Sequence, residues 1–187
     1  MTFTRRAAAG KVARMLWKLR LLWYRTDKGA LAFGVFFSLI VGALVVALNA
    51  VFWDRDQQAA RVREFHARNL DCLARNVYYE ARGEPSAGQY AVAEVTMNRK
   101  ASRHYPKTVC EVVYQKEAFS WTELSMLEPP DGAAWVRAIQ VAEDVYYQRR
   151  PRTLQPNVLH FHATYVRPDW SQEKQRVARI GKHVFYR

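Results

Sequence analysis

The chain has 187 residues, enough for one globular domain of ordinary size and one smaller feature but not for two independent enzyme cores. Its formal net charge of +12 is unevenly distributed. Residues 1–28 hold eight basic side chains and one acidic side chain, whereas residues 54–187 hold 21 basic and 16 acidic side chains. The small excess of basic over acidic residues in 54–187 suits the binding of an anionic polymer. The sequence has no motif that would read a DNA groove, so nucleic acid is excluded as a partner.

An uncharged segment, residues 30–53, is long enough to cross a bilayer as a helix. The basic residues before it predict a cytoplasmic N-terminus, following the positive-inside rule. Cleavage after Ala50 would place Leu48 where a signal peptidase needs a small residue. We therefore expect an uncleaved, single-pass membrane anchor over residues 29–53 and a basic cytoplasmic tail over residues 1–28.

The tail has two interpretations, which the sequence leaves open. It forms either a basic amphipathic helix on the inner leaflet or a disordered segment that only sets the orientation. The helical interpretation rests on apolar residues at helical spacing, namely Val12, Met15, Leu16, Leu19, Leu22 and Trp23.

The part beyond the anchor begins with residues 54–68, which are polar, lack Pro and Gly, and predict a helical stalk. The folded domain is expected near Asn69 and over residues 69–187. Helical periodicity and capping patterns predict helices over residues 70–81, 86–97, 109–113 and 131–148. Short β-prone segments at 158–161, 177–180 and 183–186 follow. The expected fold class is α+β, mainly α, with a small β portion after one transmembrane helix.

Four local signals support these boundaries. Ser86 with Gln89, and Thr108 with Glu111, have the spacing of a capping box at a helix start. Asp131 is expected to cap the fourth helix. The pair at residues 181–182, Gly-Lys, predicts a two-residue hairpin turn between the last two strands.

The two cysteines, Cys72 and Cys110, both fall beyond the anchor, where an oxidising compartment lets thiols pair. We expect a disulfide between them. The alternative is two separate buried thiols.

One stretch carries the chemistry: residues 78–85 have the sequence YYEARGEP, followed by GQ at 88–89 and AVAEVTMNR at 91–99. This order resembles the signature of the SleB-type, or spore cortex-lytic, cell-wall hydrolases. The likeness extends from about Leu70 to the C-terminus. It continues through blocks at residues 105–106, 108–110, 113–115, 119–121, 160–163 and 180–187.

The resemblance implies a lysozyme-like hydrolase domain that cleaves the glycan strand of peptidoglycan, with Glu80 as the catalytic general acid. Members of the family are described as lytic transglycosylases, in which the 6-hydroxyl of muramic acid closes on C1 to leave a 1,6-anhydro sugar. Such an acid needs a raised pKa, and its place after two tyrosines makes partial burial of Glu80 plausible. The alternative is a surface glutamate. No cofactor is expected, and the domain would face the periplasm from the inner (cytoplasmic) membrane.

Glu84 is the candidate for a second carboxylate, because it lies one helical turn beyond Glu80 if the helix continues. Gly83 argues against a continuous helix. The alternative role for Glu84 is a structural carboxylate paired with Arg82 or Arg99.

Other residues of the motif blocks are candidates to bind the sugar, because aromatic faces stack on pyranose rings and polar groups bind their substituents. For each aromatic residue, core packing is the alternative. Gln89 has a second alternative, a hydrogen bond to Asn98. The candidates are Gln89, Ser120, Trp121, His160, His162, Tyr165 and Trp170.

His160 and His162 are separated by one residue on an expected strand, so their side chains point to the same face. Two such histidines could serve as ligands of a metal ion. A third ligand would have to come from His183 or Asp169. We favour two hydrogen-bonded histidines in a cleft wall and no metal. The competing functions are a metal-dependent peptidoglycan amidase or peptidase and a non-catalytic wall-binding scaffold, and Glu80 within an intact motif counts against the scaffold.

Overall fold

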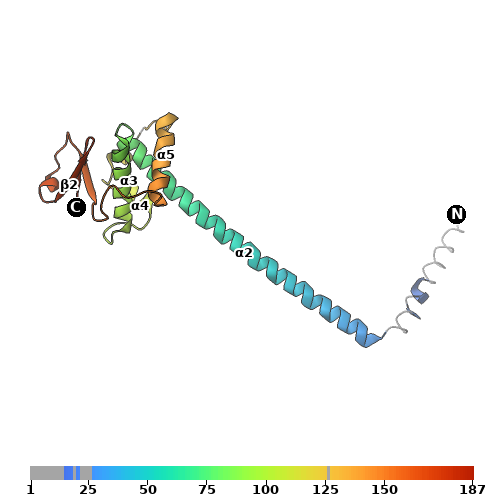
Figure 1. Cartoon of the computed structure of the whole chain (residues 1–187). Helices are drawn as coiled ribbons and strands as arrows, with labels where there is room; N and C mark the ends of the chain where they lie inside the picture. The colour runs from blue at the N-terminus through green and yellow to red at the C-terminus, as the bar shows by residue number, and fades with distance from the viewer. Residues whose placement is uncertain (1–14, 19, 22–26, 126) are drawn as a thin grey trace, which may run out of the picture. The chain divides into compact units, whose positions relative to one another are not determined.

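The computed structural model describes residues 15–18, 20–21, 27–125 and 127–187 (Figure 1). It has two compact units, Met1–Ala59 and Ala60–Arg187. The two interpretations of the N-terminal tail concern Val12, Leu19, Leu22 and Trp23, which lie outside the described residues.

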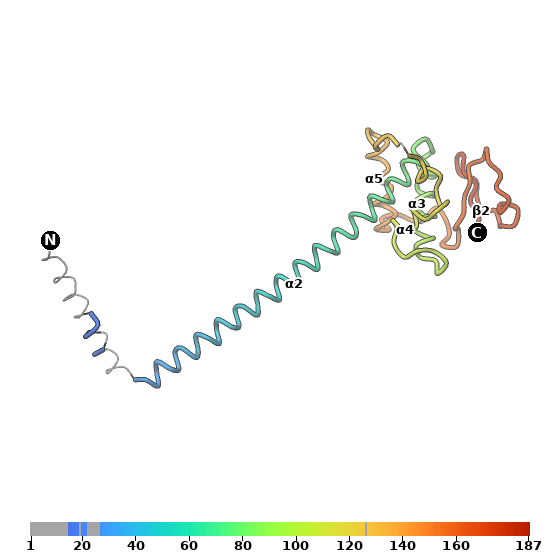
Figure 2. Tube along the Cα trace, turned by 180° about the vertical axis from the view of Figure 1, so that it is seen from behind, coloured from blue at the N-terminus to red at the C-terminus, as the bar shows by residue number. Residues whose placement is uncertain are grey.

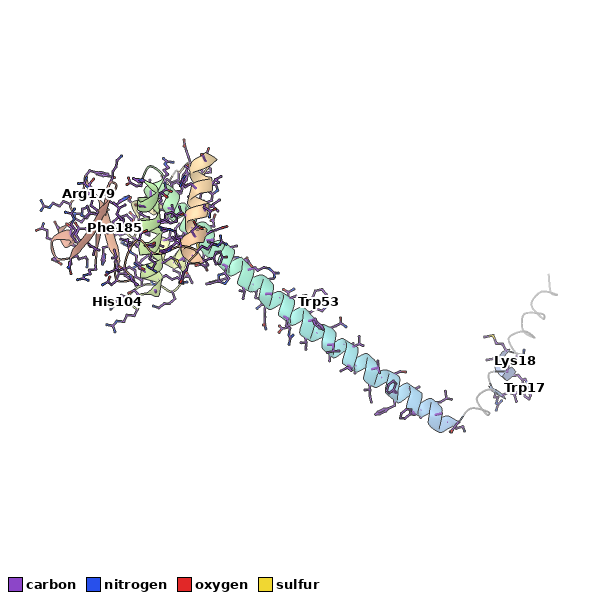
Figure 3. The ribbon with its side chains drawn as sticks, viewed as in Figure 1. Trp17, Lys18, Trp53, His104, Arg179 and Phe185 are labelled. Carbon is purple, nitrogen blue, oxygen red and sulfur yellow. A yellow bond between two sulfur atoms is a disulfide. The ribbon has the colours of Figure 1, made fainter. Side chains whose placement is uncertain are left out.

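Helix α2 runs without a break from Lys28 to Ala81 (Figure 2). Its first half holds the uncharged segment, whose side chains are exposed, including that of Trp53 (Figure 3). Among the described residues, this is one helix long and apolar enough to cross a membrane. Residues 54–68 belong to the same helix, because they contain no Gly or Pro that would interrupt it. The first buried side chain along α2 is that of Asn69.

The second unit places helix α3, Ser86–Ala101, at its centre. Helix α3 packs against α4 (Val109–Val113), against α5 (Gly132–Tyr146) and against a small sheet. Figures 1 and 2 both show α3 between α5 and that sheet. Two short 3₁₀ turns, η1 (Ser120–Glu123) and η2 (Asp169–Gln172), complete the helical part. The four predicted helices exist, although α5 is shorter than predicted and neither 3₁₀ turn was predicted.

The three predicted helix caps differ in how well they match the structure. The capping box of Thr108 and Glu111 is confirmed, with both reciprocal hydrogen bonds present. The box predicted for Ser86 is wrong, because Pro85 occupies the N-cap position and the Gln89 amide donates to the Glu84 carbonyl oxygen at 3.0 Å. Asp131 is at the N-cap of α5, but its side chain makes no capping hydrogen bond.

The sheet has three antiparallel strands in the order β1-β3-β2. Strand β1 is His160–Ala163, β2 is Arg176–Ile180 and β3 is His183–Tyr186. The β2–β3 hairpin turns at Gly181 and Lys182 as predicted, and Gly181 has the positive φ of +56° that such a turn favours. The fold is therefore mainly helical with a small antiparallel sheet, as the sequence predicted.

Two apolar clusters hold this unit together. The first joins α2, α4 and α5 through fully buried side chains such as Leu73, Val109 and Val141. The second joins α3 to the sheet and contains Val92 of α3 and Phe185 of β3, which is labelled in Figure 3. Each cluster also includes residues of both α2 and α3, so together they set the end of α2 and the face of α3 relative to the sheet.

A disulfide between Cys72 and Cys110 joins α2 to α4, the pairing that the sequence predicted. It closes a separation of 38 residues, and in the chain-entropy model a loop of that length stabilises the fold by about 4 kcal/mol. The Asn69 side-chain oxygen accepts a hydrogen bond from the Val109 amide at 2.7 Å beside it. The start of α4 is thus attached to α2 by a covalent bond and a buried hydrogen bond.

Candidate active site

Glu80 is the last residue but one of α2 and is half-buried. The two tyrosines before it pack on tryptophans: Tyr78 meets the Trp135 ring edge to face at 6.0 Å, and Tyr79 stacks on Trp121 at 4.6 Å. The partial burial of Glu80 that the sequence predicted is therefore present at the end of α2.

Burial raises the pKa of Glu80 to about 7, while the positive charge of Arg99 acts in the opposite direction. Desolvation is the larger effect. A substantial fraction of this carboxyl therefore keeps its proton at neutral pH, as a general acid requires.

Arg99 lies on α3 with its side chain buried. Its Nε donates to the Leu159 carbonyl oxygen at 2.8 Å, and its guanidinium carbon lies 5.1 Å from the Phe119 ring centre and 5.6 Å from that of Tyr105. Sequence reasoning did not single out this residue as functional. The signal was available, because Arg99 follows Val92 and Val95 at helical spacing and places a charge on the buried face of α3.

A cavity of about 380 Å³ lies beside Arg99. It brings together three of the predicted sugar-binding residues, His160, His162 and Trp170. The remaining lining comes from Tyr105, Gln115, Lys116, Glu117, Ala118, Phe161 and Pro168.

The two histidines point to the same side of β1, since both rings lie against Trp170, with centroids 5.5 and 5.7 Å away. Each ring nitrogen of His162 has a partner at 2.9 Å, the Ala163 carbonyl oxygen and the Tyr186 hydroxyl. Burial, together with the charges of Lys174 and Arg99, lowers the pKa of His160 to about 4, so this ring is neutral at physiological pH. Within the described ranges, no group of three or more His, Cys, Asp or Glu is placed to hold a metal ion.

Glu84 is paired with neither Arg82 nor Arg99. Its Oε2 accepts a hydrogen bond from the Lys182 amide at 2.7 Å and lies 3.9 Å from His183 Nδ1. Burial lowers the pKa of His183, against the opposing effect of Glu84, so His183 stays neutral. The Glu84 carboxylate therefore fastens the β2–β3 turn to the loop that follows α2.

The other predicted binding residues lie elsewhere. Gln89 is buried and bonded to the Glu84 carbonyl oxygen, not to Asn98. Trp121 is buried, donates from Nε1 to Asn76 at 3.0 Å, and so belongs to the core. Ser120 and Tyr165 are exposed, and none of these four is among the described residues that line the cavity.

Comparison with known proteins identifies the family to which this domain is similar. Residues 83–186 match the Cell Wall Hydrolase family, a match that begins three residues after Glu80. The chain is 32% identical over 130 residues to the spore cortex-lytic enzyme of Oceanobacillus iheyensis, covering 65% of this chain and 42% of that protein. It is 28% identical over 123 residues to the Bacillus subtilis enzyme of the same name, covering 65% and 38%. The chain thus spans about two fifths of the length of these relatives.

One solved structure is also similar, the catalytic domain of the germination-specific lytic transglycosylase SleB from Bacillus anthracis. The likeness has a TM-score of 0.50 at 29% identity and covers 64% of this chain and 93% of that one.

Gly181→Ala tests the contact between the hairpin and Glu84. A Cβ at this position would lie 2.0 Å from Glu84 Oε2 and 3.0 Å from Pro85 Cδ, on a backbone with φ of +56°. We expect a loss of about 1–3 kcal/mol in unfolding free energy, measured by urea unfolding of the full chain in detergent. Gly83→Ala is the matched control, because its Cβ would meet nothing within 4 Å. Equal stability of the two variants would contradict the close packing described.

Glu80→Gln tests the buried carboxyl through stability. The pKa of Glu80 is raised from 4.5 to about 7 on folding, so its stabilising contribution is complete below about pH 4.5 and is lost as the pH rises through about 7. The amide does not titrate. The variant should therefore be more stable than the native chain by up to about 3 kcal/mol at about pH 8, and the gain should vanish at low pH.

Glu143→Gln, which removes an exposed carboxylate of α5, serves as the control for this experiment and should show no comparable pH-dependent gain. If Glu80→Gln were no more stable than the native chain at about pH 8, the carboxyl would not be desolvated.

Proposed function

The chain belongs to the Cell Wall Hydrolase family, and from this membership we propose that it cleaves the glycan strand of peptidoglycan as a lytic transglycosylase, with Glu80 as its general acid. The observation that carries the proposal is the half-buried Glu80 carboxyl, with a pKa of about 7, at the end of α2. Its surroundings supply the protonation state that cleavage of a glycosidic bond needs at neutral pH.

The reaction then has two proton transfers through one carboxyl. Glu80 donates its proton to the bridging oxygen as the bond from C1 of muramic acid breaks and positive charge develops on the sugar ring. The 6-hydroxyl of the same sugar bonds to C1, and its proton passes to the Glu80 carboxylate, which restores the acid. Between the two steps Arg99 stabilises the carboxylate by its positive charge.

The position of Glu84 favours this scheme over one with two catalytic carboxylates. Ordinary glycosidases use a second carboxylate as nucleophile or base. Glu84, the candidate for that role, is occupied by the Lys182 amide, so we assign it to positioning the hairpin. A substrate that supplies its own nucleophile needs no second carboxylate from the protein.

The sugar-binding role is assigned to the side chains that meet at the cavity. Trp170 offers an aromatic face, and the neutral His160 offers one donor and one acceptor nitrogen. His162 is held between Ala163 and Tyr186, which sets the orientation of its ring.

For the location of the chain, we propose that residues 29–53 span the inner membrane, with residues 1–28 in the cytoplasm and residues 69–187 in the periplasm. Residues 54–68 would then be the stalk between the membrane and the domain. The uncharged first half of α2, the basic residues before it, and the Cys72–Cys110 disulfide beyond it all support this topology.

Reporter fusions test the topology. Alkaline phosphatase joined after Arg187 should be active, because the enzyme needs the oxidising periplasm, and a fluorescent protein that matures only in the cytoplasm should be dark there. The same fluorescent protein joined before Met1 should be bright. The reverse pattern, or release of the domain from membranes in cells, would overturn the proposed anchor.

Digestion of purified sacculi by the full chain in detergent tests the chemistry. We expect fragments with 1,6-anhydro-muramyl ends in mass spectrometry, and activity that falls as the pH rises above about 7, because Glu80 then loses its proton. Glu80→Gln should lower the rate at least about a hundredfold while remaining folded. Glu143→Gln, the same chemical change at an exposed site, should retain activity.

Other products would indicate other chemistry. Reducing sugar ends would mean water, not the 6-hydroxyl, attacks C1. Cut peptide stems, with loss of activity on chelation, would indicate a metal-dependent amidase or peptidase. Normal turnover by Glu80→Gln would remove Glu80 from the mechanism.

A further inference from the structure

The cavity beside Arg99 has an unbalanced charge. Its wall contains the buried Arg99 guanidinium, and its rim contains the exposed Lys116 and Glu117, whose charged groups pair with each other at 3.7 Å. The rim charges thus offset one another, and the charge of Arg99 remains.

No acidic side chain among the described residues forms an ion pair with Arg99. Its Nε is bonded to the Leu159 carbonyl oxygen, and Tyr105 is its other polar neighbour, so both of these partners are neutral. Glu80 influences the pKa of Arg99 but forms no ion pair with it, and with a pKa of about 7 the Glu80 carboxyl is only partly ionised at neutral pH. A buried guanidinium without a carboxylate partner is unfavourable, so an anion entering the cavity would gain a strong charge-assisted hydrogen bond.

His160 lines the same cavity and directly follows Leu159, whose carbonyl oxygen is bonded to Arg99. Burial first, and the charges of Lys174 and Arg99 second, lower the pKa of His160 to about 4, so its ring is neutral. A neutral ring can donate a hydrogen bond to an anion without adding a charge of its own.

We propose that this cavity binds a carboxylate carried on the lactyl arm of muramic acid, with Arg99 as its main ligand. The inference rests on the proposed function, because it takes the bound sugar to be the muramic acid whose glycosidic bond Glu80 protonates; Glu80 itself is not among the described residues that line the cavity. A planar guanidinium matches a carboxylate with two parallel hydrogen bonds, and the neutral His160 ring can donate a further one. A volume of about 380 Å³ has room for such an arm but not for a long peptide.

The carboxylate has two sources in the wall polymer. On strands stripped of peptide it is the lactyl carboxylate itself, and on intact strands it belongs to the peptide stem attached to that arm. The cavity would recognise a carboxylate in both cases, so an experiment must distinguish the lactyl group from the peptide stem.

The test measures binding to the non-cleaving Glu80→Gln full chain in detergent, by calorimetry. The probes are a GlcNAc–MurNAc tetrasaccharide with free lactyl carboxylates, its methyl ester, the same glycan with intact stems, and chitotetraose. We expect the free acid to bind about tenfold more tightly than the ester and than chitotetraose. Tighter binding of the stem-bearing glycan than of the free acid would assign the carboxylate to the stem; the opposite order would assign it to the lactyl group.

Arg99→Gln in the same background should abolish the difference between acid and ester. Because this side chain is buried, its folding must be checked by circular dichroism and thermal unfolding. Lys116→Gln provides an independent variant at an exposed position and should weaken binding of the acid about twofold to threefold without affecting the ester. Lys107→Gln, an exposed change outside the cavity lining, should bind all probes as before.

Equal affinity for acid and ester, in a folded protein that binds both, would overturn the carboxylate site. This failure is distinct from failure of the proposed function, which would show as unchanged sacculi after digestion by the native chain. A carboxylate preference that survives in folded Arg99→Gln would also overturn the assignment of Arg99.

Discussion

The contact between the Glu84 carboxylate and the Lys182 amide is the constraint on which the site depends. It joins the loop after α2, where Glu80 ends the helix, to the turn between β2 and β3. Strand β3 pairs with β1, so the same contact determines where His160 lies. The turn can approach this closely only because Gly181 has no side chain. One buried carboxylate therefore sets the distance between the acid and the cavity wall.

Two glutamates four positions apart have acquired different roles from their surroundings. Glu84 accepts a hydrogen bond from the backbone amide of Lys182 and so holds the hairpin. Glu80 is half-buried, and desolvation outweighs the opposing charge of Arg99, so the pKa of its carboxyl rises to about 7. Glu84 contacts the hairpin and has a structural role, whereas Glu80 does not and is left as the candidate acid.

Local sequence patterns predicted what depends on neighbours in the chain. The periodicity of the helices, the Thr108 capping box and the hairpin at Gly181 all follow from a few adjacent residues, and all are present. Predictions that required a long-range contact did less well. Trp121 is in the core because Asn76 and Tyr79 lie behind it. One local prediction also failed: the Ser86 capping box is absent because Pro85 is the N-cap residue and the Gln89 amide bonds the Glu84 carbonyl oxygen.

The difference between local patterns and long-range contacts also explains why the sequence identified Glu80 but not Arg99. A motif identifies the acid directly, whereas the role of Arg99 appears only when α3 is packed against the segment before β1. On that face of α3, the Glu94 carboxylate accepts from the amides of residues 153 and 154, and the Asn98 amide donates to the carbonyl oxygens of residues 155 and 158.

The hydrogen bonds of these side chains to the backbone hold the segment that leads into β1, and the side chains of Arg150 and Arg152 also pair with Glu94 and Asn98. Arg99 shares in this docking through a single nitrogen, Nε, bonded to Leu159. Arg99 also lines the cavity together with His160 and forms no ion pair with an acidic side chain among the described residues. A polar side chain that is satisfied by backbone has its role inside the fold, whereas a buried charge left without a counter-charge at the wall of a cavity is available to a ligand.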